Sequence, residues 1–186
     1  RCQAWQHGAM SISRLGRQIS EVVQTLQKIG ANHALIGGLA LAPHKVVRAT
    51  QDVDLLTDAE FADAIDRELI RIGYRCLYRS ADASNYLRGD ERVDLLYASR
   101  PIARRLLASA TERSTVFGPL RVLNLEGLIA FKLQGYVNDP RRTQDLEDIR
   151  ALLRANRDTV DRTVLEEYFR LFHQEQLLDE LLKDIS

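Results

Sequence analysis

One stretch, residues 36–55, constrains the possible folds of this chain more than any other. A short apolar run stops at the pair Gly37-Gly38, and after thirteen further residues the chain reads Asp52-Val53-Asp54. A glycine pair lets backbone N–H groups approach a bulky anion, because no Cβ stands in the way. Aspartates on alternate residues of a strand point to one face, where both reach a common cation. The combination predicts phosphoryl or nucleotidyl transfer from a magnesium-bound triphosphate.

The polar face of this stretch extends backwards from the two aspartates. If the extended conformation begins by Val47, period-2 alternation places Val47, Val53 and Leu55 on the opposite, apolar face. The polar face then carries Arg48, Thr50, Asp52 and Asp54. The alternative is an edge strand with solvated aspartates, which is the usual setting of an isolated Asp-x-Asp. The alternation of charged and apolar residues favours a half-buried strand with a functional polar face.

The whole pattern resembles the core motif of the DNA polymerase β-type nucleotidyltransferase superfamily. Within it, Arg48-x-Thr50-x-Asp52-x-Asp54 is similar to the AbiEii-like nucleotidyltransferases, which include toxins of toxin–antitoxin systems. The resemblance implies an α/β (α+β) fold, with a small mixed sheet flanked by helices and a helical C-terminal half. It also implies transfer of a nucleoside monophosphate from a nucleoside triphosphate (NTP), ATP among the candidates, to an acceptor hydroxyl with release of pyrophosphate.

The resemblance assigns roles to the residues of this stretch. It implies that Asp52 and Asp54 hold two Mg²⁺ ions, and that Gly37 and Gly38 supply backbone N–H donors to the triphosphate. The side chains of Arg48 and Thr50 complete the polar face, toward the nucleotide or toward the acceptor.

Asp94 is the candidate third carboxylate. It lies in the middle of an expected strand, between Val93 and Leu95, where an unpaired carboxylate is costly. One solution is a salt bridge to an arginine such as Arg48 or Arg92. The resemblance implies another: Asp94 shares a metal ion with Asp52 and Asp54 and helps to accept the acceptor's proton.

Two further candidates lie in the C-terminal half. Lys132 stands among apolar residues of an expected helix, where a lysine usually extends its ammonium to solvent. The resemblance implies instead that Lys132 neutralises triphosphate charge. Asp145 and Asp148 match a pair of aspartates in the family, whereas Gln144 stands where the family usually has a lysine. Asp145 either orients Lys132, or binds on the nucleotide side, or is a helix N-terminal carboxylate favoured by the macrodipole.

Composition limits the classes of partner. The chain of 186 residues has zero formal net charge, so it lacks the global basic field that drives sequence-independent nucleic-acid binding. Its arginine clusters form either a local patch or solvated helix surface: Arg100, Arg104, Arg105, Arg141 and Arg142. Cys2 and Cys76 do not make a disulfide framework. No apolar run approaches the roughly 20 residues needed to span a membrane, so the cytoplasm is the default expectation.

The periodicity of apolar residues predicts one α/β unit followed by helices. Helices are expected over 13–29, 57–72, 101–113, 125–133 and most of 145–185. Strands are expected over 34–36, 47–55, 74–78, 85–88 and 91–97, and a hairpin over 114–123. We expect a nucleotidyltransferase core at 10–124 and a helical region at 125–186 packed on that core. Residues 1–9 are interpreted as a remnant of the expression vector or a disordered extension.

The acceptor and the partners stay open at this stage. An RNA, tRNA or protein acceptor, with an antitoxin as partner, follows from the resemblance to AbiEii-like toxins. A small-molecule acceptor, as in the antibiotic nucleotidyltransferases that share this core, is an alternative. A non-catalytic nucleotidyltransferase-like binding module is another, which Gln144 favours and the retained carboxylates disfavour.

Overall fold

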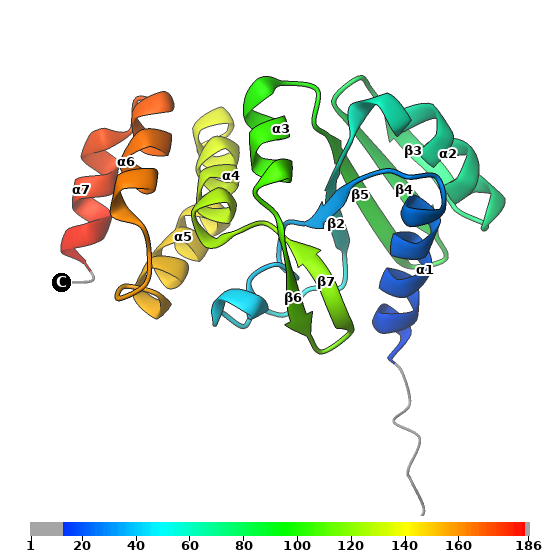
Figure 1. Cartoon of the computed structure of the whole chain (residues 1–186), viewed down its shortest axis with the longest axis horizontal. Coiled ribbons are helices and arrows are strands. Elements are labelled where there is room, and N and C mark those ends of the chain that lie inside the picture. Colours follow the sequence, from blue (N-terminus) through cyan, green and yellow to red (C-terminus); the bar gives the residue numbers. More distant parts are fainter. Residues whose placement is uncertain (1–12, 185–186) are drawn as a thin grey trace, which may run out of the picture.

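A computed structural model describes residues 13–184 as a seven-stranded mixed sheet with helices around it (Figure 1). The sheet has the strand order β3-β4-β5-β2-β1-β7-β6. The strands are β1 (His33–Leu35), β2 (Val53–Thr57), β3 (Arg75–Arg79), β4 (Ala83–Arg88), β5 (Glu91–Tyr97), β6 (Thr111–Thr115) and β7 (Gly118–Val122). The helices are α1 (Arg14–Lys28), α2 (Ala62–Arg71), α3 (Pro101–Ala108), α4 (Leu125–Asn138), α5 (Thr143–Ala155), α6 (Arg162–Leu171) and α7 (Glu175–Lys183), with 3-10 turns η1 (Ala42–His44) and η2 (Ala59–Phe61). The mixed α/β fold predicted from the sequence is confirmed.

Strand β2 lies at the centre of the sheet and positions the acidic motif. It pairs antiparallel with β1 and parallel with β5, and in the second pairing Asp54 stands opposite Asp94. Val53 and Leu55 are fully buried, so the apolar side of β2 faces the core and fixes the register. The two aspartates of neighbouring strands therefore lie at the same level of the sheet.

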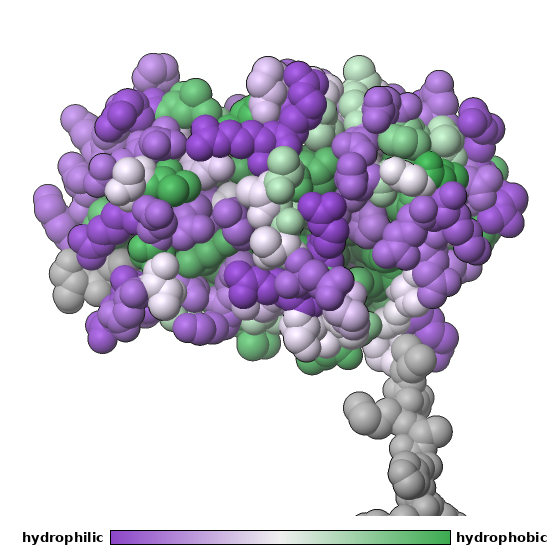
Figure 2. All heavy atoms as spheres, viewed as in Figure 1, coloured by the Kyte–Doolittle hydropathy of each residue, from purple (hydrophilic) through white to green (hydrophobic). Residues whose placement is uncertain are grey.

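Most of the helices occupy two ends of the molecule, and α3 lies between them (Figure 1). Helices α1 and α2 pack on each other beside β3–β5, and α4 to α7 pack together at the opposite end. One continuous set of buried apolar side chains joins the sheet to the helical end, including Leu55, Leu133 and Ile149. The face in Figure 2 carries mainly hydrophilic side chains with smaller apolar areas between them. Apolar side chains therefore lie mostly inside.

The structure does not test the predictions for residues 1–9 and for the domain boundary. The interpretation of residues 1–9 falls outside the described residues. The boundary between a core at 10–124 and a helical region at 125–186 stays a prediction, although helix α4 begins at Leu125. Among residues 13–184, no helix has the length and apolar character needed to cross a membrane.

The strand expected from Val47 onward is shorter in the structure. Strand β2 begins only at Val53, and residues 46–52 have no regular secondary structure. The prediction that Val47 takes a buried face is wrong, because its side chain is 92% exposed. Pro43 in the 3-10 turn η1 and the left-handed backbone of Lys45 (φ 67°) redirect the chain just before this segment.

The helical expectations also need two corrections. The helix predicted over 101–113 ends at Ala108, because residues 111–115 pair with β7 as the edge strand β6. The region 145–185 is three helices rather than one run. Asn156 ends α5, and His173, with its left-handed backbone (φ 56°), separates α6 from α7.

Candidate active site

Every residue predicted for the site lines one cavity of about 670 Å³. The set comprises Gly37, Gly38, Arg48, Thr50, Asp52, Asp54, Asp94, Lys132 and Asp145. The wall includes the turn after β1, the segment leading into β2, strands β2 and β5, helix α3 and the α4–α5 pair. Folding thus brings together residues that lie more than a hundred positions apart in the sequence.

The glycine pair is required by close packing against the chain's own side chains. Gly37 has a left-handed backbone (φ +67°), and a Cβ there would collide with the carboxylate of Asp54. A Cβ on Gly38 would lie 2.9 Å from the Cβ of Thr50 and 3.1 Å from Nη2 of Arg48. The absent side chains let the glycine turn and the polar face meet at the cavity wall.

The carboxylates of Asp52, Asp54 and Asp94 bring like negative charges to a partly buried part of the cavity wall. Asp54 is half-buried, and burial raises its pKa from the ordinary value of 3.8 to about 7, with the neighbouring charges of Asp94 and Asp52 acting in the same direction. The cations of Lys132 and Arg48 oppose this rise in pKa but do not cancel it. A group in this state binds either a proton or a cation at neutral pH.

Asp94 has a partner that the sequence did not indicate. Its Oδ1 accepts a hydrogen bond of 2.6 Å from Nδ2 of Asn85, which stands opposite it on β4. Arg48, one of the arginines considered as a salt-bridge partner, lies against Asp148 instead. The alternation of residues along β4 and β5 does not identify Asn85 as the partner of Asp94 unless the register between the two strands is already known.

The donor chemistry of this site fits a hard divalent cation, since carboxylate oxygens are the ligands that Mg²⁺ prefers. Burial, and after it the like charges of Asp94 and Asp52, raise the pKa of Asp54 where it lines the cavity. Within residues 13–184, however, no three His, Cys, Asp or Glu side chains are already arranged with the spacing of metal ligands. Asp52, Asp54 and Asp94 therefore stay predicted ligands.

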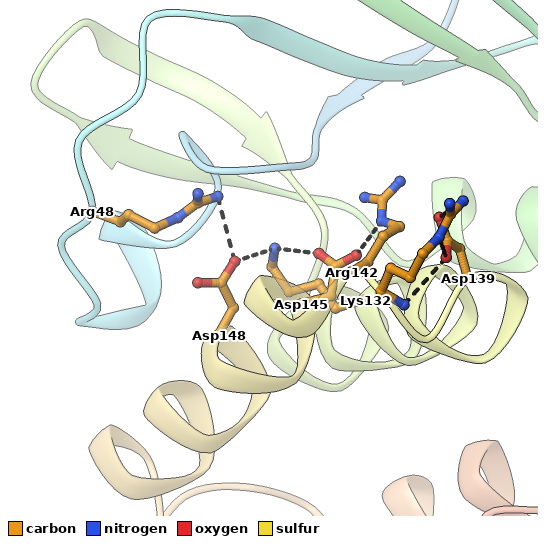
Figure 3. A network of polar contacts seen from close by, with 7 residues as sticks. Arg48, Lys132, Asp139, Arg142, Asp145 and Asp148 are labelled. Atoms are coloured by element: carbon orange, nitrogen blue, oxygen red, sulfur yellow. Dashed lines mark hydrogen bonds and ion pairs between the residues drawn. The ribbon is translucent and has the colours of Figure 1, made fainter.

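Lys132 belongs to a buried network of charges between α4 and α5 (Figure 3). Its side chain is 2% exposed, so the alternative of an ammonium extended to solvent is wrong. The Nζ atom lies 2.6 Å from Oδ2 of Asp148 and 3.4 Å from Oδ1 of Asp145. Arg142 Nε donates to Asp145 Oδ2 over 2.7 Å. Of the three interpretations of Asp145, two are seen: it contacts Lys132, and it lies in the first turn of α5 as a helix N-terminal carboxylate.

Asp148 is the member of this network to which the sequence assigned no role. Its Oδ2 also lies 3.4 Å from Nη2 of Arg48, and its Oδ1 accepts a hydrogen bond of 3.0 Å from Gln144 Nε2. Gln144, which replaces the lysine expected there, thus contributes an amide hydrogen bond to the network. The signal available in the sequence was the i, i+3 spacing of Asp145 and Asp148.

Comparison with known proteins gives the fold a name. The family model described as aminoglycoside-2''-adenylyltransferase matches residues 18–95. The solution structure of the antibiotic-resistance factor ANT(2'')-Ia is 16% identical, with a TM-score of 0.68, covering 91% of this chain and 97% of that one. The lincomycin-bound structure of the lincosamide antibiotic adenylyltransferase LnuA is 15% identical, with a TM-score of 0.55, covering 76% and 96%.

A nucleotidyltransferase-like protein from Paracoccidioides brasiliensis is similar as well. It is 18% identical, with a TM-score of 0.56, covering 91% of this chain and 92% of that one. No curated protein sequence matches the chain. The narrower relationship to AbiEii-like proteins is not shown by these likenesses. The chain has the fold of the nucleotidyltransferases.

Proposed function

We propose that this protein transfers a nucleoside monophosphate from an NTP to a hydroxyl group of an acceptor. The acceptor oxygen forms a bond to the α-phosphorus, the bond from that phosphorus to the bridging oxygen breaks, and pyrophosphate leaves with the electron pair. The observation that carries the proposal is the meeting of Asp52, Asp54 and Asp94 with the Gly37-Gly38 turn in one cavity. Positioning and charge stabilisation supply most of the catalysis in such a transfer.

Each residue has a definite part in this proposal. Asp52 and Asp54 would hold the magnesium ions, which would supply charge stabilisation at the attacking and leaving oxygens when bound. Asp94, with one oxygen held by Asn85, shares that site and accepts the proton of the acceptor hydroxyl at its other oxygen. Lys132 offers positive charge to the triphosphate from the cavity wall.

The backbone N–H groups of Gly37 and Gly38 donate to phosphate oxygens, as proposed from the sequence. Arg48 and Thr50 face the cavity beside the glycine pair, and Asp145 keeps Lys132 in place on the other side.

We propose a small molecule as the acceptor. A cavity of about 670 Å³ falls within the roughly 300–1,000 Å³ typical of small-molecule sites. Of the similar structures, one is named an antibiotic-resistance factor and another a lincosamide antibiotic adenylyltransferase, which supports the same choice. The zero net charge gives no general attraction to a nucleic acid. An RNA, tRNA or protein acceptor is the second candidate, kept because of the AbiEii-like motif at residues 48–54.

The direct test is transfer of α-phosphate label from each of the four NTPs, with Mg²⁺, to a panel of hydroxyl compounds and to tRNA. We expect label in an aminoglycoside or lincosamide, and loss of at least about a thousandfold in turnover for Asp54→Asn. The matched control is Asp158→Asn, which changes an exposed aspartate paired with its neighbour Arg157. Equal labelling by Asp54→Asn and wild type would refute the assignment.

Growth of an expressing host separates the two acceptor classes. If the chain acts on tRNA or a cellular protein as a toxin does, active protein slows growth and Asp54→Asn relieves the effect. If the acceptor is an antibiotic, growth is unchanged and resistance to that antibiotic rises. Slow growth without labelling of any small molecule would overturn the choice of a small-molecule acceptor.

A further inference from the structure

We propose that helix α5 sets the geometry of the nucleotide side of the cavity through Asp148, a positioning residue that holds the Lys132 ammonium and the Arg48 guanidinium together. The proposal rests on the proposed function, since Lys132 is assigned there to the triphosphate and Arg48 lies beside the glycine pair that donates to it. It adds a residue that lies behind the cavity wall, because Lys132 and Arg48 line the cavity and Asp148 does not. Asp148 therefore acts through its two partners.

The contacts of Asp148 leave its carboxylate fully engaged. The residue is 2% exposed, and its Oδ2 lies 2.6 Å from Lys132 Nζ and 3.4 Å from Arg48 Nη2. Its Oδ1 accepts the hydrogen bond from Gln144. Lys132 comes from α4 and Arg48 from the irregular segment 46–52, so one carboxylate ties three separate parts of the chain (Figure 3).

The segment that leads into the acidic motif depends on such contacts. Residues 46–52 make no strand or helix, so regular backbone hydrogen bonding does not fix their path. The C-terminal end of helix α5 makes a second contact, with the turn η1 that immediately precedes this segment. The buried side chain of Asn156, at the C-terminal end of α5, donates from Nδ2 to the backbone oxygen of His44 over 2.9 Å.

The charges of the network explain why Asp148 matters for an anionic ligand. Lys132, Arg48 and Arg142 bring three positive charges, and Asp145 and Asp148 bring two negative ones. These five residues taken alone therefore carry a single surplus positive charge. Without Asp148 two cations would face each other with less compensation, and Arg48, which is partly exposed, would move toward solvent.

The test is Asp148→Asn, which keeps the shape of the side chain and removes its charge. We expect the Kd of the magnesium–NTP complex, measured by calorimetry, to rise at least tenfold. In turnover assays the KM for NTP rises by a similar factor while the KM for the acceptor changes less than twofold. The matched control is Glu147→Gln, an exposed carboxylate on the same helix that pairs with Arg150.

The kinetic and binding results separate a positioning role of Asp148 from a purely structural one. A purely structural role for Asp148 would reduce the active fraction, and hence kcat, with both KM values unchanged, and that result overturns the proposal. If Asp148→Asn does not fold, Asp148→Glu keeps the charge but displaces it, and we expect at least a threefold rise in the Kd for NTP. An unchanged Kd in Asp148→Glu overturns the proposal too. If the wild-type protein neither binds nor transfers any NTP, the proposed function fails rather than the role of Asp148.

Discussion

The two sides of the cavity treat charge in opposite ways. On the sheet side, Asp52, Asp54 and Asp94 bring like charges together, and the pKa of Asp54 rises to about 7 because burial and its neighbours disfavour the charged form. On the helical side, Lys132 is more deeply buried, yet its ammonium has two carboxylate partners. On the helical side, the protein itself neutralises the buried charges. On the sheet side, the negative charges of the carboxylates are neutralised only when a proton or a metal cation binds from solution.

The largest expected effect that separates the two sides is a pH dependence of stability. The unfolded chain releases the Asp54 proton near pH 4, whereas the folded chain keeps it up to about pH 7. The free energy of unfolding therefore falls as pH rises from about 4 to 7, by up to about 4 kcal/mol from this group. Urea denaturation in EDTA at several pH values measures this slope.

Asp54→Asn is the control for this measurement, since its side chain has no proton to release. The difference in unfolding free energy between Asp54→Asn and wild type should grow from pH 4 to pH 7 and stay constant above about pH 7. A difference that does not change with pH would contradict a raised pKa for Asp54.

The next effect concerns the helical side. Lys132→Met leaves Asp145 and Asp148 buried without their shared cation, and we expect a loss of about 3 kcal/mol in unfolding free energy. Lys183→Met, at the exposed end of α7, is the matched control and should change stability by less than about 0.5 kcal/mol. Equal stability of the two variants would show that the network contributes nothing to folding.

The smallest effect concerns the hydrogen bond to Asp94. Asn85→Ala removes the donor that holds Asp94 Oδ1, and we expect kcat to fall about tenfold, equivalent to about 1.4 kcal/mol, with the KM for NTP unchanged. Gln24→Ala, which removes an exposed amide on α1, is the control. A rise in the KM for NTP at constant kcat would instead assign Asn85 to nucleotide binding.

Local patterns in the sequence predicted much of the sheet side. The alternation around Val53 and Leu55 placed the apolar face of β2 correctly, and both side chains are fully buried. The spacing from Gly37-Gly38 to Asp54 predicted a meeting of turn and strand, and the structure brings them into direct contact. Such features depend on neighbours in the chain, where periodicity carries the information.

Long-range contacts decided the rest and left little trace in the sequence. The path of residues 46–52 depends on Lys45, which adopts a left-handed backbone without being glycine, and on Asn156 more than a hundred positions away. The contact of Asp148 with Arg48 likewise joins positions a hundred residues apart. Neither periodicity nor composition encodes such a pairing, so the contacts of Asp148 and Asn85 were recognised only in three dimensions.

The measurement that tests the central claim most directly is calorimetric titration of wild type and Asp54→Asn with Mg²⁺ and an NTP. We predict that wild type binds the NTP only with Mg²⁺ or Mn²⁺, that this binding raises its thermal stability, and that Asp54→Asn loses both effects. Failure of wild type to bind any NTP in the presence of either ion would contradict the claim. So would equal binding with and without the ion, because the sheet side would then need no cation from outside.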